Sequence, residues 1–259
     1  MNELVVKMAI VCPLVFLAGF IDSIAGGGGI ISLPAYLFAG LPMHQALGTN
    51  KFSSLCGSTI ATGRYLKNGC VYKPLIIPTV LCSLAGSAIG ARLTLFVSDS
   101  VLKHLMLIVL PIVAVIVFLR KTPPAKNNGS LEETESTPLS LLKFVLSCLI
   151  AFVIGMYDGF YGPGTGTFLI LCFTYFIGLD VRQASGNTKC VNWASNAAAL
   201  TTFLIHGKVL FILGVAAAAC SILGNYLGSG LVIKDGIKYV RPIVFVVLAL
   251  LFIKILFKL

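Results

Sequence analysis

Apolar stretches long enough to span a membrane recur along almost the whole of this 259-residue chain. A helix needs about 20 apolar residues to cross the hydrocarbon core of a bilayer, and lipid cannot pair backbone groups, so such stretches are predicted to be helices. With 58% hydrophobic and 11% charged residues, the chain lacks the charge that a soluble surface requires. We therefore predict an all-α integral membrane protein with about ten hydrophobic helical segments, at residues 4–21, 30–41, 45–66, 74–97, 101–120, 139–157, 167–179, 183–205, 208–232 and 238–257.

The second half of the chain repeats the first. Chance similarity between apolar helices would match Leu and Val, whereas here Gly, Gln and Lys recur at a constant offset of 138 residues. The repeated set is Gly40, Gln45, Ala46, Gly48 and Lys51, matched by Gly178, Gln183, Ala184, Gly186 and Lys189. Upstream, an offset of 136 aligns Asp22 with Asp158. We predict a first transmembrane repeat at 1–120, a polar linker at 121–138 and a second repeat at 139–259, inverted because each half holds an odd number of segments.

The net charge of +10 could suggest a nucleic-acid partner, but the basic residues stand at segment ends rather than in clusters. With every segment crossing, 11 lysines and arginines fall on the side of the linker and 6 on the other, Lys51 and Lys189 being counted as buried. The positive-inside rule then predicts an inner-membrane protein with a cytoplasmic linker. The eight cysteines form no CxxC pair, so we expect neither a metal site nor a cofactor.

Four ionisable residues fall inside apolar segments. Asp22 and Asp158 stand where an apolar helix runs into a glycine cluster, and Lys51 and Lys189 lie well away from segment ends. Such groups cost at least about 2.5–3.5 kcal/mol at membrane depth, so they usually face a cavity or a partner. Two structural interpretations stay open beside a binding role: each half holds its own Asp–Lys pair, or each Asp caps the next helix.

Each of these aspartates precedes a glycine-rich stretch that is predicted to break the helix near the midplane. Glycine costs close to 1 kcal/mol relative to Ala in a helix, and Pro163 also removes a donor. Broken backbone at this depth must be buried in protein or line a wet cavity, and the next helix start attracts an anion. The candidate contacts are Gly27, Gly28, Gly29, Gly164, Thr165 and Gly166. Helix packing is the alternative, and it explains Gly86/Gly90 and Gly224/Gly228 better than it explains a run of four glycines.

Polar side chains continue from each lysine along one helical face. Lys51, Ser54 and Ser58 lie at i, i+3 and i+7, and Lys189, Asn192 and Asn196 repeat this spacing. Asn50 and Thr188 stand directly before the two lysines and add further donors. Ammonium groups, helix starts, hydroxyls and amides together predict an anion site. The chain has no GxxxxGK[ST] motif, so ATP hydrolysis is not expected.

The same residues resemble the sulfite exporter TauE/SafE family, also called the TSUP permeases. The motifs that carry the resemblance are Gly19–Ala25 with its four glycines, Gly48–Lys51, Tyr157–Gly164 and Thr188-Lys189, and the similarity covers nearly all of the chain outside the linker. The resemblance implies transport of small sulfur-containing anions such as sulfite or organosulfonates. The residues by themselves indicate only an anion.

We therefore expect a secondary transporter, not an enzyme, that moves a small anion across the inner membrane at a site between the repeats. Lys51 and Lys189 would supply charge, while Asp22 and Asp158 would hold the lysines or take up coupled protons. A passive anion channel and a membrane scaffold subunit are the alternatives. The expected partners are a small-molecule anion and the lipid bilayer, without nucleic acid, and a homo-oligomer stays open.

Overall fold

A computed structural model describes residues 3–119 and 139–235 of the chain. The first half forms α1 (Glu3–Ala25), α2 (Gly29–Phe38), α3 (Met43–Lys67), α4 (Lys73–Phe96) and α5 (Asp99–Leu119). The second half forms α6 (Leu141–Phe160), α7 (Thr165–Cys172), the π-helix η1 (Phe173–Ile177), α8 (Val181–Ile205) and α9 (Phe211–Asp235). The described residues contain no strand, which confirms the predicted all-α class. The predicted linker (121–138) and the last predicted segment (238–257) lie outside the described residues.

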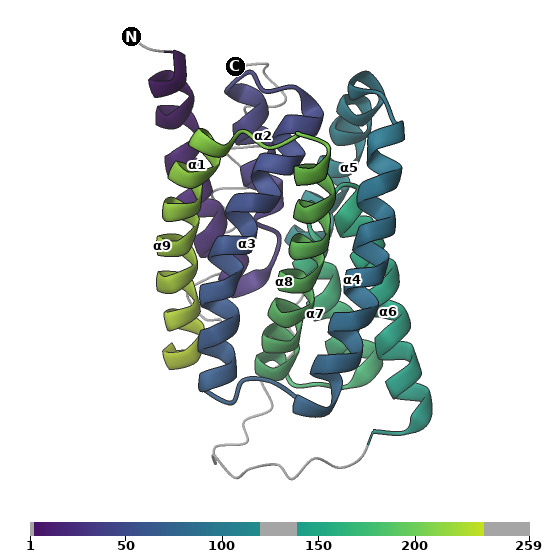
Figure 1. Cartoon of the computed structure of the whole chain (residues 1–259). Helices are drawn as coiled ribbons and strands as arrows, with labels where there is room; N and C mark the ends of the chain where they lie inside the picture. Colours follow the sequence, from purple (N-terminus) through teal and green to yellow (C-terminus); the bar gives the residue numbers. More distant parts are fainter. Residues whose placement is uncertain (1–2, 120–138, 236–259) are drawn as a thin grey trace.

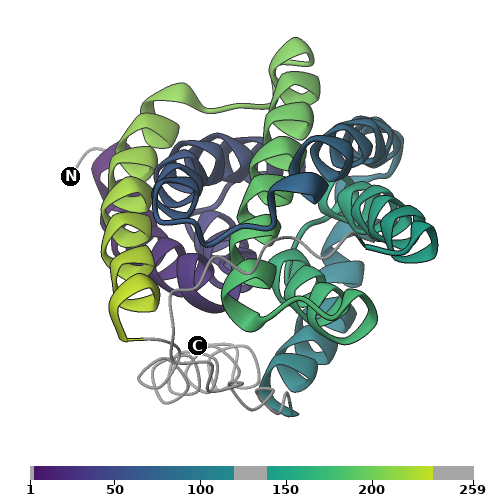
Figure 2. The same cartoon turned by 90° about the horizontal axis from the view of Figure 1, so that it is seen from below.

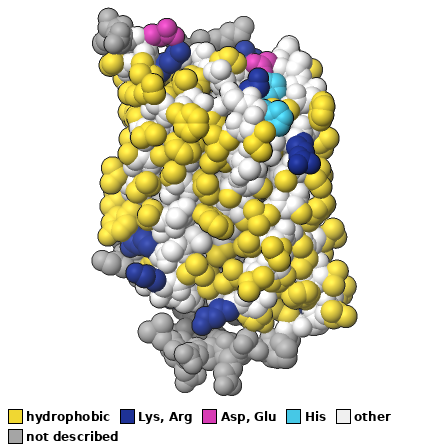
Figure 3. Space-filling model, viewed as in Figure 1, with side chains coloured by type: hydrophobic (Ala, Val, Ile, Leu, Met, Phe, Trp, Pro, Cys, Tyr) yellow, Lys and Arg dark blue, Asp and Glu magenta, His cyan; other side chains and the backbone are white. Residues whose placement is uncertain are grey.

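Four of the described helices are long and apolar enough to cross a membrane: α1, α4, α6 and most of α9. Side chains on the face shown in Figure 3 form a broad apolar band, with most charged groups toward its two ends. Exposed large hydrophobic side chains such as Ile77, Leu142 and Phe211 belong to this outer surface. An apolar belt of this kind matches the hydrocarbon of a bilayer.

The polar helices α3 and α8 lie between two flanking helix pairs. Figures 1 and 2 show α1 and α9 on one side and α4 and α6 on the other. Each flanking pair combines one helix from each half of the chain, so the two repeats interlock. This arrangement shields the polar stripes of α3 and α8 from lipid.

Glycines let the flanking helices approach each other closely. A Cβ atom on Gly86 or Gly90 of α4 would overlap backbone carbonyls of α6, and one on Gly224 or Gly228 of α9 would overlap those of α1. These four glycines therefore serve helix packing, which confirms that interpretation of their spacing.

The two repeats run in opposite directions. The α3–α4 connection lies at one end of the molecule and the equivalent α8–α9 connection at the other (Figure 1). Equivalent contacts recur as well: the Leu210 amide donates to Thr49 Oγ1, and the Tyr72 amide donates to Asn187 Oδ1, both at 3.0 Å. These observations confirm the predicted inverted repeat.

The helices α2 and α7 are each too short to cross a bilayer alone. A 10-residue helix such as α2 rises only about 15 Å, half of a hydrocarbon core. It returns the chain from the break after α1 to the end of the molecule where α1 begins (Figure 1). Because α1 and α2 enter and leave at the same end, the predicted division of basic residues between the two sides is unchanged.

Candidate functional site

The buried lysines and aspartates pair crosswise between the repeats. Lys51 Nζ lies 2.7 Å from Asp158 Oδ2, and Lys189 Nζ lies 2.5 Å from Asp22 Oδ2. Lys51 and Lys189 are only 3% and 1% exposed. The interpretation in which each half holds its own Asp–Lys pair is therefore wrong. Inversion is the reason, because it places the lysine helix of one repeat against the broken helix of the other.

The two glycine breaks contact each other at the centre of the molecule. Gly26 and Gly27 have φ angles of 71° and 91°, in the left-handed region that favours glycine. A Cβ atom on Gly26 would overlap the backbone of Gly166, and Thr167 Oγ1 donates to the Ala25 carbonyl at 3.2 Å. Two stretches that lie about 140 residues apart thus form one wall instead of two separate sites.

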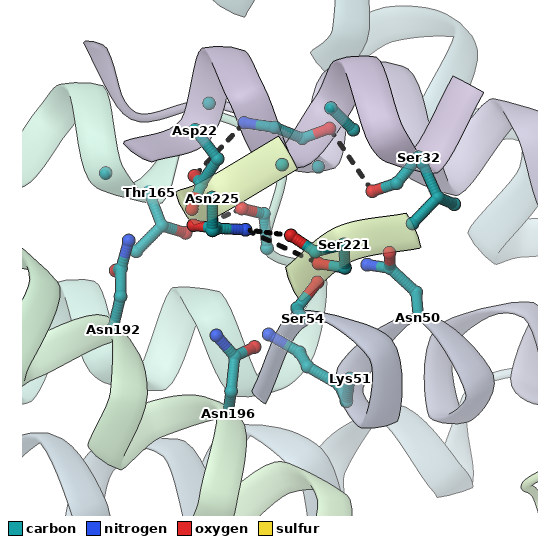
Figure 4. Close-up of a pocket in the computed structure, with 18 of the residues that line it drawn as sticks. Asp22, Ser32, Asn50, Lys51, Ser54, Thr165, Asn192, Asn196, Ser221 and Asn225 are labelled. Atoms are coloured by element: carbon teal, nitrogen blue, oxygen red, sulfur yellow. Dashed lines mark hydrogen bonds between the residues drawn. The ribbon is translucent and has the colours of Figure 1, made fainter. Parts of the chain in front are cut away.

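A cavity opens beside this wall (Figure 4). Its lining comes from α1, α2, α3, α6, α7, α8, α9 and the two breaks. The residues that line it are Val15, Ala18, Gly19, Asp22, Gly27, Gly28, Gly29, Ser32, Asn50, Lys51, Ser54, Asp158, Gly162, Thr165, Gly166, Asn192, Asn196, Ser221 and Asn225. Polar side chains from both repeats therefore converge on one space.

Most residues of the predicted site line this cavity, and three do not. The cavity includes Lys51, both aspartates, Gly27, Gly28, Gly29, Thr165, Gly166, Asn50, Ser54 and Asn192. Lys189, Thr188 and Gly164 are absent from the lining. Of the two predicted stripes, Asn196 reaches the cavity, whereas Ser58 donates to the Leu55 carbonyl within its own helix. The two halves therefore contribute unequally, and of the two lysines Lys51 lines the cavity.

The two aspartates have different surroundings. Asp22 Oδ1 accepts the Gly28 amide at 3.2 Å, so this carboxylate holds the start of α2 as well as Lys189. Asp158 accepts the Ser195 hydroxyl at 2.5 Å in addition to Lys51. The Asp22 side chain is 23% exposed and that of Asp158 is 7% exposed. Asp22 is thus the more accessible carboxylate.

Part of the backbone at the breaks is already bonded within the protein. The Gly28 amide donates to Asp22, and the Thr165 amide donates to the Gly162 carbonyl at 3.3 Å. Both N–H groups were predicted to donate to an anion, but each already donates to an acceptor within its own break. The positive charge in the cavity lining therefore comes from Lys51.

Sequence reasoning missed two polar residues of α9, Ser221 and Asn225, and also Ser32 of α2. Ser221 and Asn225 stand four residues apart in an apolar segment, on one helical face. Ser229 continues the same spacing. A search for polar residues at this spacing in apolar segments would have found them, as it found the stripes of α3 and α8.

Comparison with known proteins then tests the resemblance. The model of the family described as sulfite exporter TauE/SafE matches residues 11–255 of this chain. The chain belongs to the TauE/SafE family. No solved structure matched it.

Its curated relatives in the TauE/SafE family carry names of transporters. A probable membrane transporter protein, ORF9, of a Sinorhizobium species is 39% identical over 93% of this chain and 89% of its own length. A probable membrane transporter protein of Haemophilus influenzae is 35% identical over 92% and 89%. The probable membrane transporter protein YfcA of Escherichia coli K12 is 34% identical over 93% and 86%. This TauE/SafE chain is accordingly a multi-pass membrane transporter.

Proposed function

We propose that the protein is a secondary transporter that moves small anions across the inner membrane, with sulfur-containing oxyanions such as sulfite or organosulfonates as cargo. The observation that carries this proposal is the position of Lys51. Lys51 lines the cavity beside the two joined glycine breaks, where an anion would meet its ammonium group. The choice of a sulfur-containing cargo rests on the family description, and the choice of an anion rests on the positive charge and polar donors of the site.

The anion would take the place of a carboxylate. Lys51 is held by Asp158, so an anion that binds Lys51 competes with Asp158 for the ammonium group. Asn50, Ser54, Asn192 and neighbouring polar groups add hydrogen bonds around it, and Gly27–Gly29 allow close approach to the backbone. Lys189 acts from outside the cavity by holding Asp22, and Asp22 is the candidate for proton uptake.

The inverted repeat gives the proposed transporter a means of alternating access. The two Lys–Asp pairs are related by the internal symmetry, but of the two lysines Lys51 lines the cavity and Lys189 does not. In the opposite state the equivalent groups around Lys189 would face the other side of the membrane. Rocking of two repeats about one fixed site is the common mechanism in such folds.

Uptake of labelled sulfite and of sulfonates by proteoliposomes tests the function. Lys51→Ala should lower uptake by about 10- to 100-fold, because a charged hydrogen bond contributes about 1.5–3 kcal/mol. Lys73→Ala is the matched control, since Lys73 is exposed at the start of α4. Wild-type rates in Lys51→Ala, or uptake that never saturates, would overturn the proposal.

A further inference from the structure

The side chain of Asn225 of α9 lies against a glycine of α1 and a glycine of α3. The residue is 2% exposed and lines the cavity. A Cβ atom on Gly19 of α1 would stand 2.8 Å from Asn225 Nδ2, and one on Gly57 of α3 would overlap the same amide. Both neighbouring helices therefore carry glycine where this carboxamide projects between them.

Hydrogen bonds fix which end of the Asn225 amide is which. Nδ2 donates to the Ser221 carbonyl at 3.0 Å and lies 3.4 Å from Ser221 Oγ. A backbone carbonyl can only accept, so the nitrogen must face it. The oxygen Oδ1 is then turned away from Ser221, is fully buried, and has no donor among the residues that the structure describes.

A buried acceptor without a hydrogen-bond donor destabilises the folded protein. The same position in the other repeat avoids this cost. At the offset of 138 residues, Ser83 and Ser87 of α4 replace Ser221 and Asn225, and their hydroxyls donate to the carbonyls of Val191 and Ser195 at 3.0 and 2.6 Å. Helix packing in this fold therefore does not require an unpaired amide, and at this position only the second repeat carries a carboxamide.

The charges around the cavity cancel. Lys51 is paired with Asp158, and Lys189 is paired with Asp22. A bound anion adds its charge to a site that is already neutral, and uncompensated charge is expensive at membrane depth. A singly charged anion is therefore a better cargo than a doubly charged one.

We propose that the cargo is a singly charged anion that also carries a hydrogen-bond donor, which it gives to Asn225 Oδ1. Its anionic end binds at Lys51, and its hydroxyl, amino or acidic O–H group faces α9. Figure 4 draws Asn225 and Ser221 in the middle of the view, above Lys51 and Asn196, and all four line the cavity. The inference rests on the proposed anion transport and deepens it by assigning the selecting residue.

Two sulfonates of nearly equal shape test the inference. We would measure how strongly 2-hydroxyethanesulfonate and 1-propanesulfonate compete with uptake of labelled sulfite in proteoliposomes of the full chain. The hydroxylated compound should compete about tenfold better, the ratio that about 1.4 kcal/mol corresponds to. Equal competition would overturn the inference, and it is also the result expected if a water molecule bonds to Asn225 Oδ1.

Variants then assign the preference to Asn225. Asn225→Leu removes the amide at similar size, and Asn225→Ser copies the residue of the other repeat, so one of them serves if the other fails to fold. Either should reduce the ratio to about twofold or less, as expected for loss of one hydrogen bond. Ser87→Ala, at the equivalent position, should leave the ratio unchanged. A folded Asn225 variant that keeps the full preference would contradict the assignment.

The uptake assay distinguishes a failure of the proposed transport function from a failure of the inference about Asn225. If the wild-type chain takes up neither labelled sulfite nor labelled sulfonates, the proposed function is wrong. If it takes up sulfite but does not distinguish the two sulfonates, only the inference about Asn225 is wrong.

Discussion

At the scale of single residues, the crossed ion pairs are the feature on which the site depends. Lys51 and Asp158 lie 107 positions apart, and Lys189 and Asp22 lie 167 apart, yet each pair is in direct contact. Removing one member of a buried pair leaves the other charge without compensation, which typically costs about 3–5 kcal/mol. Removing both members costs less, because no lone charge is left behind.

Double substitutions can therefore show which residues are partners. Lys51→Met should lower the melting temperature in detergent by roughly 10 °C, since about 1 kcal/mol corresponds to about 2–4 °C in a chain of this size. Lys51→Met combined with Asp158→Asn should regain at least half of that loss. Lys51→Met combined with Asp22→Asn, the pair within one repeat, should be no more stable than the single variant. Recovery in this second combination instead of the first would contradict the crossed pairing.

The sequence predicted the ionisable residues of the site, but it could not predict their partners. Asp22, Lys51, Asp158 and Lys189 stand out because ionisable groups are rare in apolar segments. Their pairing depends on how the inverted repeats interlock, which spacing along the chain does not encode. Asn225 was missed because the polar spacing of Ser221, Asn225 and Ser229 was not sought in a segment that carries no ionisable residue at its centre.

At the scale of elements, glycines set how closely helices approach. A Cβ atom on Gly90 would overlap the Met156 carbonyl, so α4 and α6 touch through their backbones. Gly63 of α3, by contrast, has open space among the described residues where a Cβ atom would stand. A side chain at Gly90 would therefore clash with α6, whereas a side chain at Gly63 would not clash with the described residues.

We expect Gly90→Ala to destabilise the protein, because α4 and α6 must separate to admit the methyl group. A loss of about 1–3 kcal/mol is typical of overpacking. Gly63→Ala should be neutral or stabilising by up to about 1 kcal/mol, because Ala favours a helix. Thermal unfolding of both variants in the same detergent provides the measurement. Equal stability of the two variants would show that this close contact does not exist.

The breaks were predicted from their glycines, but α1 extends further than expected. Residues 22–25 remain helical, because the left-handed conformations begin only at Gly26. Helix α7 begins at Thr165, which is earlier than predicted, and continues into the π-helix η1. A helix boundary is set by backbone angles and local hydrogen bonds, which residue composition indicates only to within a few residues.

Substitutions at two glycines with left-handed φ angles can distinguish the effect of backbone strain from the effect of close contact. Gly26 (φ 71°) lies against Gly166, whereas an added Cβ on Gly40 (φ 81°) would meet no atom of the described residues within 4 Å. Gly40→Ala should lose only the left-handed preference, about 1–2 kcal/mol. Gly26→Ala should lose more and should also lower sulfite uptake, because the two breaks are pushed apart. Uptake that is equally affected in both variants would argue against contact between the breaks.

At the scale of the whole molecule, the inverted repeat fixes which connections share a side. The α1–α2 and α6–α7 connections lie inside the fold, so α3, α4 and α5 decide the side on which the linker emerges (Figure 1). The fold class and the repeat were both predictable, because hydropathy and a constant offset are properties of the chain itself. The order in which helices pack against each other was not, since interlocking of the repeats is a tertiary feature.

The side of the linker is testable in cells. A biotin-acceptor tag placed within 121–138 should be biotinylated by a cytoplasmic ligase, because the richer share of basic residues lies on that side. A tag placed at Gly40, which has open space around it, should stay unmodified. Modification of both tags would contradict the inverted arrangement, and modification of the Gly40 tag alone would reverse the orientation.

Binding of an anion beside Lys51, in the cavity next to the two joined glycine breaks, is the central proposal. Selenite, the selenium counterpart of sulfite, can be located by its anomalous scattering in crystals of the wild-type protein. The account predicts a peak within about 4 Å of Lys51 Nζ, the distance expected when an oxyanion accepts a charged hydrogen bond. A protein that transports selenite but shows its peak elsewhere, with none at Lys51, would contradict it.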